Sequence, residues 1–97
     1  KFHIPAQHPC YEAHFPGNPI VPGALLLQWI QTLVTEQCPG QRVIAVPAVK
    51  FLSLVRPDTC IVIEMDRALA GKLRFRALCK SSTVCEGSFL LEDNSQF

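Results

Sequence analysis

The chain has little charge, and neither sign is in clear excess. Only 18% of its 97 residues are Asp, Glu, Lys or Arg, and the formal net charge is +1. Nucleic-acid-binding domains usually carry a concentrated basic excess, so this balance argues against a nucleic-acid partner. Long apolar runs are also missing. Runs such as residues 24–27 are far shorter than the ~20 residues that span a bilayer, so we expect no membrane span.

Paired cysteines are missing as well. The number of cysteines is odd, and no two of them form a C-x-x-C pair. This usage predicts reduced thiols, packed as small hydrophobes, in a cytoplasmic protein. No apolar stretch of a secretory signal follows the first residues, and the missing initiator Met indicates a trimmed chain. The cysteines are Cys10, Cys38, Cys60, Cys79 and Cys85.

Common site motifs are absent too. The spacing of His3, His8, Cys10 and His14 matches no common zinc pattern, and prolines separate these candidates, so we expect no metal. A Cys–His nucleophile is weakly indicated, because nothing in the sequence singles out one cysteine as activated. No Gly-rich phosphate loop and no Ser-His-Asp signature occur, and no cofactor is expected.

A stiff loop followed by an apolar segment is the most informative feature that is present. Three prolines and two glycines lie within residues 14–23, where they restrict the backbone around His14. A helix is expected from about residue 22, where Pro suits a first turn, to about residue 36, before the stop signal Pro39-Gly40. This helix is apolar on nearly every side, which predicts that other structure wraps it completely.

The residues outside the loop and the helix are predicted to form β-strands. Residues 2–4 are compatible with a short strand. Residues 42–55 are β-branched and apolar but interrupted by Pro47, which predicts a bulge, an edge or a break. Further strands are expected at 60–68, 72–80 and 83–92, with turns at residues 56–59, 70–71 and 81–82. The order predicts one α+β domain over residues 1–97, in which an antiparallel sheet curls around one long helix.

With 48% hydrophobic residues in so short a chain, we also expect an oligomer.

Two residues suit acid–base and electrostatic catalysis. The ordinary pKa of an imidazole fits His14 for proton transfer near neutral pH, whereas the plainer alternative is a loop histidine bonded to a carbonyl. The N–H of Gly23 would lie at the positive end of the helix dipole, where it can polarise a carbonyl oxygen. The alternative is that this glycine serves turn geometry alone.

A basic strip on one strand is a candidate surface for an acidic partner. Lys72, Arg74, Arg76 and Lys80 alternate with apolar residues, and Lys50 and Arg56 are candidates to lie nearby. A solvated sheet face is the favoured interpretation of this pattern.

Two stretches closely resemble a known family. Residues 14–25 read H-F-P-G-x-P-I-V-P-G-x-L, similar to the signature of hotdog-fold 3-hydroxyacyl-[acyl-carrier-protein] dehydratases. Residues 49–59, V-K-F-L-x-L-V-R-P-D-T, resemble the strand and turn of that family, with a glycine missing from the turn. Residues 75–89 resemble its last hairpin. The pair Gln28-Trp29 resembles the Asp-Trp of a dehydratase branch associated with aryl-polyene gene clusters.

The resemblance implies a fold, a reaction and a set of residues. It implies a hotdog fold whose subunits pair to form two sites, and a trans-2-enoyl thioester product in fatty-acid or polyene biosynthesis. His14 would remove the Cα proton, Gly23 would polarise the thioester carbonyl, and the carbonyl near Ile20 would orient the imidazole. The substrate would be a thioester of acyl carrier protein or coenzyme A. By the same resemblance, the acyl-binding residues would be Phe15, Ile20, Val21, Trp29 and Phe51, and the carrier contacts Lys50, Arg56, Arg74 and Arg76.

One departure from the family is chemically important. Where the family places the Glu or Asp that protonates the departing hydroxyl, this chain has Gln28. An amide cannot supply that proton, although it can hydrogen-bond the hydroxyl or a water. Two alternatives to a homodimeric dehydratase therefore remain open. One is an acyl-thioester hydrolase on the same fold. The other is a catalytically weak acyl-binding subunit, which would form a heterodimer with an active paralogue.

Overall fold

A computed structural model describes residues 2–9, 20–67 and 71–93. It contains one long helix and a five-stranded antiparallel sheet with the strand order β1-β3-β4-β5-β2. The elements are β1 (Phe2–His3), α2 (Gly23–Gln37), β2 (Gln41–Phe51), β3 (Cys60–Arg67), β4 (Lys72–Cys79) and β5 (Ser82–Asp93). This is the α+β arrangement expected from the sequence.

The helix α2 begins and ends close to the predicted residues. Pro22 is its N-cap, with a φ of −60° that suits entry into a helix. The helix ends at Gln37, and Gly40, with a φ of +83°, turns the chain into β2. That turn is closed by a hydrogen bond from the N–H of Gln41 to the carbonyl of Cys38, at 3.1 Å. The helix–strand boundary is therefore set by local residues, as the sequence indicated.

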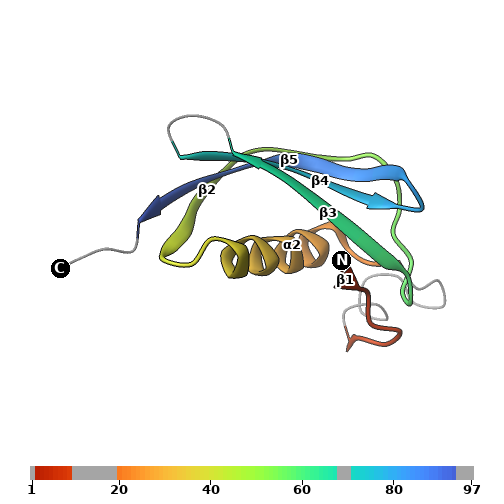
Figure 1. Cartoon of the computed structure of the whole chain (residues 1–97). Helices are drawn as coiled ribbons and strands as arrows, with labels where there is room; N and C mark the ends of the chain where they lie inside the picture. The colour runs from red at the N-terminus through yellow and green to blue at the C-terminus, as the bar shows by residue number, and fades with distance from the viewer. Residues whose placement is uncertain (1, 10–19, 68–70, 94–97) are drawn as a thin grey trace.

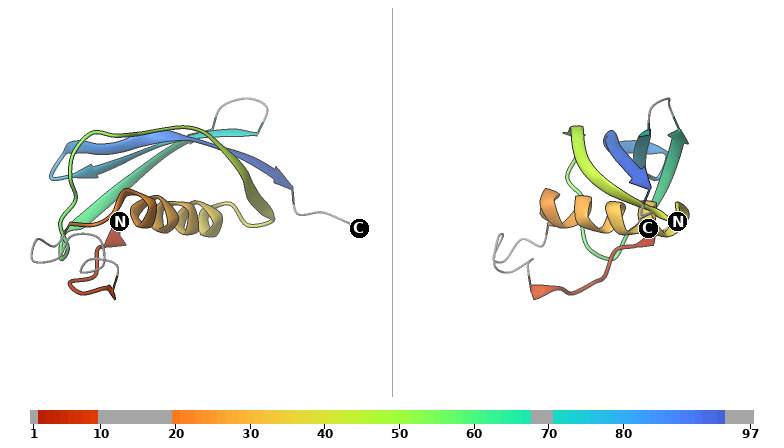
Figure 2. Two further views of the ribbon diagram at one scale, coloured as in Figure 1. Left: turned by 180° about the vertical axis from the view of Figure 1, so that it is seen from behind. Right: turned by 90° about the vertical axis from the view of Figure 1, so that its left-hand side faces the viewer.

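The sheet arches over one side of α2 and leaves the opposite side uncovered along most of its length (Figures 1 and 2). Only one stripe of the helix is fully buried, formed by Leu26, Ile30 and Val34. Other apolar helix residues, such as Leu25 and Leu33, are half-buried. The prediction of complete wrapping is therefore wrong for the single chain, because one sheet layer contacts only one face of a helix.

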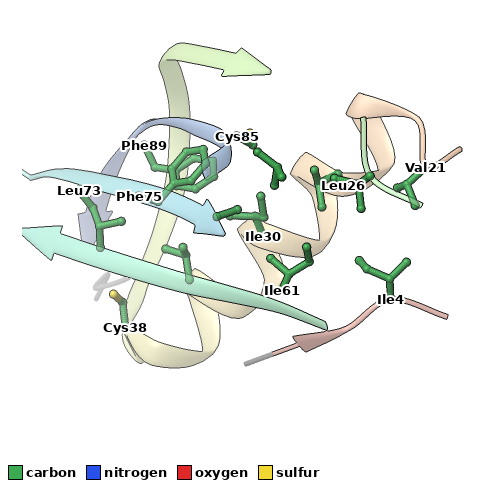
Figure 3. Close-up of a cluster of buried hydrophobic side chains, with 14 of the residues drawn as sticks. Ile4, Val21, Leu26, Ile30, Cys38, Ile61, Leu73, Phe75, Cys85 and Phe89 are labelled. Carbon is green, nitrogen blue, oxygen red and sulfur yellow. The ribbon is translucent and has the colours of Figure 1, made fainter. Parts of the chain in front are cut away.

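The core lies between this helical stripe and the inner face of the sheet (Figure 3). Alternation along β4 places Leu73, Phe75 and Ala77 on that face, all buried, as expected from the sequence. The rings of Phe75 and Phe89 stack at a centroid distance of 4.7 Å. Burial of each such side chain contributes about 1.5–3 kcal/mol. The sheet and the helix are therefore held together by one continuous apolar core.

Two irregularities shape the sheet. The register between β2 and β5 shifts on both sides of Ala45, so the interruption predicted at Pro47 is confirmed as a bulged edge strand. The β4–β5 hairpin turns at Lys80 and Ser81, which both have positive φ values of 51° and 69°. That turn was predicted one residue later, at 81–82. Two consecutive left-handed residues match the twist of a hairpin, and this requirement sets the register.

Candidate functional site

The predicted catalytic loop is only partly within the described structure. His14 and Phe15 lie outside the described residues. Ile20 and Val21, at the end of the loop, are both buried, with 6% and 5% of their surfaces exposed. The N–H of Val21 donates to the carbonyl of Val55 at 2.8 Å. This bond joins the two stretches of sequence that resemble the dehydratases, so they form one structural unit.

The first residue of α2 lies against an aromatic ring of β2. A Cβ atom placed on Gly23 would be 3.0 Å from Cζ of Phe51 and 3.2 Å from two further ring atoms. Phe51 keeps 46% of its surface exposed. Sequence reasoning left open whether Phe51 approaches the site from the same chain or from a partner; the contact with Gly23 is made within one chain. Glycine at this position lets the ring approach the helix backbone.

The N-terminus of α2 is electrostatically open. Its N-cap is a proline that makes no side-chain hydrogen bond, and its first turn contains no acidic residue. The first helical hydrogen bond runs from Leu26 to Pro22, at 3.0 Å, so the N–H of Gly23 has no place in the helical ladder. The positive end of the helix dipole is therefore not neutralised by α2 itself, which suits a developing negative charge on a carbonyl oxygen.

Gln28 faces solvent, whereas the neighbouring Trp29 contacts other side chains. Gln28 is exposed, and five residues of helix rotate it by roughly 140° from the direction of Gly23. Trp29 packs against the N-terminal segment instead. Its ring lies 5.5 Å from Phe2 and 5.8 Å from His8, the latter edge-on. Within one chain the described structure does not bring either side chain to the Gly23–Phe51 contact, and the substrate-binding role of Trp29 stays a prediction.

The predicted carrier contacts lie on exposed surfaces, but acids are interleaved among them. Cross-strand register places Arg76 between Glu64 and Glu86, and Arg76 Nη2 lies 2.8 Å from Glu64 Oε1. Arg74 lies between Asp66 and the buried Ser88. The following residues line a shallow hollow of about 740 Å³ on this face: Ala48, Glu64, Met65, Asp66, Lys72, Arg74, Phe75, Arg76, Glu86, Gly87 and Ser88. The face is thus of mixed charge rather than uniformly basic, and the carrier contacts stay a prediction.

One polar cluster was not found by sequence reasoning. Pairing of β1 with β3 places His3 beside Cys60 and Asp58, while His8 contacts Trp29. His3 and His8, the two candidate metal ligands within the described residues, therefore have separate surroundings. Among residues 2–9, 20–67 and 71–93, no group of three His, Cys, Asp or Glu residues is arranged to hold a metal ion. Only the strand register, which sequence spacing does not reveal, could have identified the cluster.

In the described residues, one long helix lies beneath a curled antiparallel sheet, which is the arrangement of the hotdog fold. Similarity to known proteins agrees with this class. A family model described as ApeI-like, ApeI dehydratase, matches residues 1–88. The chain belongs to this family of dehydratases, which confirms the resemblance seen in the sequence, including the aryl-polyene-associated branch.

Curated relatives point to the same reaction class. The chain is 28% identical over 99 residues to the 3-hydroxyacyl-[acyl-carrier-protein] dehydratase FabZ of Caldicellulosiruptor saccharolyticus, covering 90% of this chain and 71% of that protein. It is 29% identical to the FabZ of Chloroflexus aggregans, covering 90% and 69%. These relatives are hydro-lyases, so the chain is related to enzymes that remove water from hydroxyacyl substrates.

Solved structures support the fold. An uncharacterised protein from Erwinia carotovora superposes with a TM-score of 0.79 at 20% identity, covering 97% of this chain and 81% of that chain. The dehydratase heterocomplex ApeI:P from Xenorhabdus doucetiae gives the same TM-score at 21% identity, covering 93% and 81%. No helix in the described ranges is both long and apolar enough to cross a membrane.

Proposed function

We propose that the protein dehydrates 3-hydroxyacyl thioesters to trans-2-enoyl thioesters, with His14 as the base. The observation that carries this proposal is the uncapped start of α2 at Gly23, next to the ring of Phe51. The Gly23 N–H would stabilise the enolate oxygen that forms when His14 takes the Cα proton. Phe51, with Ile20 and Val21, would contact the acyl chain, and Phe15 is proposed for the same role.

The proton balance of the elimination is unusual. After abstraction, the side chain of His14 is an imidazolium that carries the proton taken from Cα, and the hydroxyl must leave as water. Because Gln28 has no proton to give, the proton on His14 would return to the leaving oxygen, directly or through a water. Gln28 would hold that oxygen by a hydrogen bond from its amide. Loss of an independent acid is expected to slow the reaction by about 10²- to 10⁴-fold relative to a site that has one.

The proposed substrate is carried by an acyl carrier protein, as the names of the FabZ relatives indicate for those enzymes. Arg56 is the best proposed carrier contact, since no ion pair to it is found in the described part of the chain. Lys50 stays a candidate, but the strand register places it directly opposite Glu86. Arg76 is already paired with Glu64, and Arg74 is flanked by Asp66. A carrier-bound substrate would place the reaction in the cytoplasm.

A second subunit is proposed to cover the open side of α2 and the edge strand β2. Apolar side chains along β2 and just after it are unusually exposed: Ile44, Val46, Val49, Phe51, Leu52 and Leu54. Burying such a patch is favourable. We favour a homodimer. A heterodimer with an active paralogue is the second candidate, because Gln28 weakens the chain's own chemistry and the dehydratase ApeI:P is itself a heterocomplex.

The proposal is tested by turnover of a 3-hydroxyacyl carrier thioester by the purified chain. Formation of the enoyl product is expected, and His14→Ala should reduce kcat/KM by about 100-fold or more. His8→Ala is the matched control and should leave the rate unchanged. Release of free thiol without enoyl product would instead support a hydrolase. Tight acyl binding without turnover, with activity appearing only beside a paralogue, would support the binding subunit.

A further inference from the structure

The paired ends of β1 and β3 bring a thiol, an imidazole and a carboxylate close together. His3 and Cys60 are directly opposite each other in the antiparallel register. His3 Nδ1 lies 3.3 Å from the Cys60 Sγ, and His3 Nε2 lies 2.8 Å from Asp58 Oδ1. The imidazole therefore bridges the thiol and the carboxylate, which is the arrangement that activates and orients a nucleophile.

The backbone holds these three groups in place. The N–H of Ile4 donates to the carbonyl of Thr59 at 2.8 Å, and the N–H of Asp58 donates to the carbonyl of Ile4 at 3.1 Å. Ile4 itself is fully buried. Asp58 has a φ of +63°, in the left-handed region that favours glycine, and glycine is the residue missing from this turn relative to the resembled pattern. An aspartate thus occupies a position where glycine would be less strained, and its carboxylate contacts His3.

The groups around His3 favour the protonated form of its imidazole. The pKa of His3 is raised, first by its hydrogen bond with Cys60 and then by that with Asp58. A protonated imidazole beside a thiol favours the thiolate, which is the reactive form. Cys60 is exposed, so a reagent can reach it.

The other described cysteines do not combine exposure with a neighbouring imidazole and carboxylate. Cys38 and Cys85 are buried, and burial, together with the charge of Glu86, raises the pKa of Cys85 to about 11. Cys79 is half-buried. One thiol among the four described cysteines therefore combines exposure with an imidazole and a carboxylate.

We propose that Cys60 is a nucleophilic thiol, activated by His3 and positioned through Asp58, that is modified by hydroperoxides. The thiolate sulfur attacks one peroxide oxygen, a sulfur–oxygen bond forms, and the oxygen–oxygen bond breaks. The sulfur is oxidised to a sulfenic acid, and the peroxide is reduced. The leaving group, hydroxide from hydrogen peroxide or alkoxide from an organic hydroperoxide, takes the proton of the His3 imidazolium and departs as water or alcohol. This site uses none of the residues proposed to catalyse dehydration, so it stands whether or not the proposed function holds.

The test measures the reaction rate of each cysteine in the folded protein by peptide mass spectrometry, with hydrogen peroxide and a sulfenic-acid trap. Alkylation by iodoacetamide is measured in parallel. Cys60 is expected to react about tenfold faster than Cys79, and His3→Gln should lower the Cys60 rate about tenfold with either reagent. Asp58→Asn, which tolerates the same backbone conformation, should lower it by a smaller factor.

Matched controls separate activation from loss of fold. His8→Gln makes the same change at the histidine that contacts Trp29 and should leave the Cys60 rate unaltered. Continued protection of the buried Cys85 shows that each variant keeps its core. A Cys60 rate that is equal in the wild type and His3→Gln, with Cys85 still protected, would overturn the proposal. So would a Cys60 rate no higher than that of Cys79.

Discussion

At the scale of single residues, the proposed site has a helix N-terminus without a side-chain cap and, at position 28, an amide where the family has an acid. The start of α2 has neither a side-chain cap nor an acidic residue, so its N–H groups are free of competing negative charge from the helix. Gln28 lies on the same helix but is rotated away from Gly23 and is exposed. We therefore propose that Gln28 acts on a substrate bound at Gly23 of another subunit.

Restoring the acid is expected to increase dehydration. Gln28→Glu would give the leaving hydroxyl a proton donor, and we expect kcat for enoyl formation to rise by at least about tenfold. The measurement is steady-state turnover of a 3-hydroxyacyl carrier thioester by wild type and variant. Gln31→Glu makes the same substitution one turn along the helix and should have no such effect. An unchanged rate in Gln28→Glu would mean that another group protonates the leaving oxygen.

The raised pKa of His3 predicts a pH-dependent contribution to stability. The folded protein binds this proton more tightly than the unfolded chain, because Cys60 and then Asp58 hydrogen-bond the imidazole. The contribution is therefore fully present below the unfolded-state value of about 6.5, and it is lost as the pH rises through the folded-state pKa. Wild type should exceed His3→Gln in free energy of unfolding at about pH 5.5, and the difference should shrink by about pH 8.5.

Urea unfolding at both pH values measures this difference. His8→Gln serves as the control, and its difference from wild type should not follow the same trend. A gap between wild type and His3→Gln that stays constant, or grows as the pH rises, contradicts the expected coupling.

At the scale of elements, the pairing of β2 with β5 depends on one glycine. A Cβ on Gly87 would lie 2.3 Å from the carbonyl oxygen of Ala48 and 2.9 Å from the Cα of Val49. Both are backbone atoms, so β2 would have to move to remove the clash. Since Phe51 lies on the same strand, the position of the ring against Gly23 depends on this pairing.

Gly87→Ala is therefore expected to destabilise the fold by about 2–3 kcal/mol. Chemical denaturation gives the change in free energy of unfolding. Gly40→Ala is an informative comparison, because nothing lies within 4 Å of its added Cβ but its φ is +83°. It should cost about 1 kcal/mol, from backbone strain alone. A Gly87→Ala protein as stable as wild type would show that the sheet edge adapts freely.

At the scale of the whole molecule, the described residues of one chain bury only one stripe of α2. The sheet ends at β2, an edge strand with apolar side chains exposed, and α2 presents half-buried residues away from the sheet. Edges of this kind are usually paired or covered. A second subunit would do both.

Placing a charge on the β2 edge is expected to disrupt the oligomer. Val46→Lys, at a position 37% exposed in the single chain, should shift the mass in solution from dimer to monomer, as measured by light scattering after gel filtration. Val62→Lys is the matched control: that valine is 45% exposed but lies on β3, away from the β2 end of the sheet. If Val46→Lys remained dimeric, the subunit contact would have to lie on another surface.

Much of the fold could be predicted because its signals are local. Pro22 and the Pro39-Gly40 pair bound the helix, and alternation along residues 72–80 identifies the inner face of β4. The bulge near Pro47 follows from the missing backbone donor of proline. The hairpin turn was misplaced by one residue, because consecutive positive φ values at Lys80 and Ser81 are a requirement of strand twist rather than of the residues themselves.

By itself, the sequence determined the helix, the strands, the dehydratase family and the amide at position 28, since each depends on residue types and their spacing along the chain. Only the tertiary structure decided that Phe51 contacts Gly23 within one chain, that acids interleave the basic strip, and that His3 lies between Cys60 and Asp58. These contacts join residues that are distant in sequence. Their existence depends on strand order and register, which are set by burial of the shared core and by turn geometry rather than by residue types along one stretch of the chain.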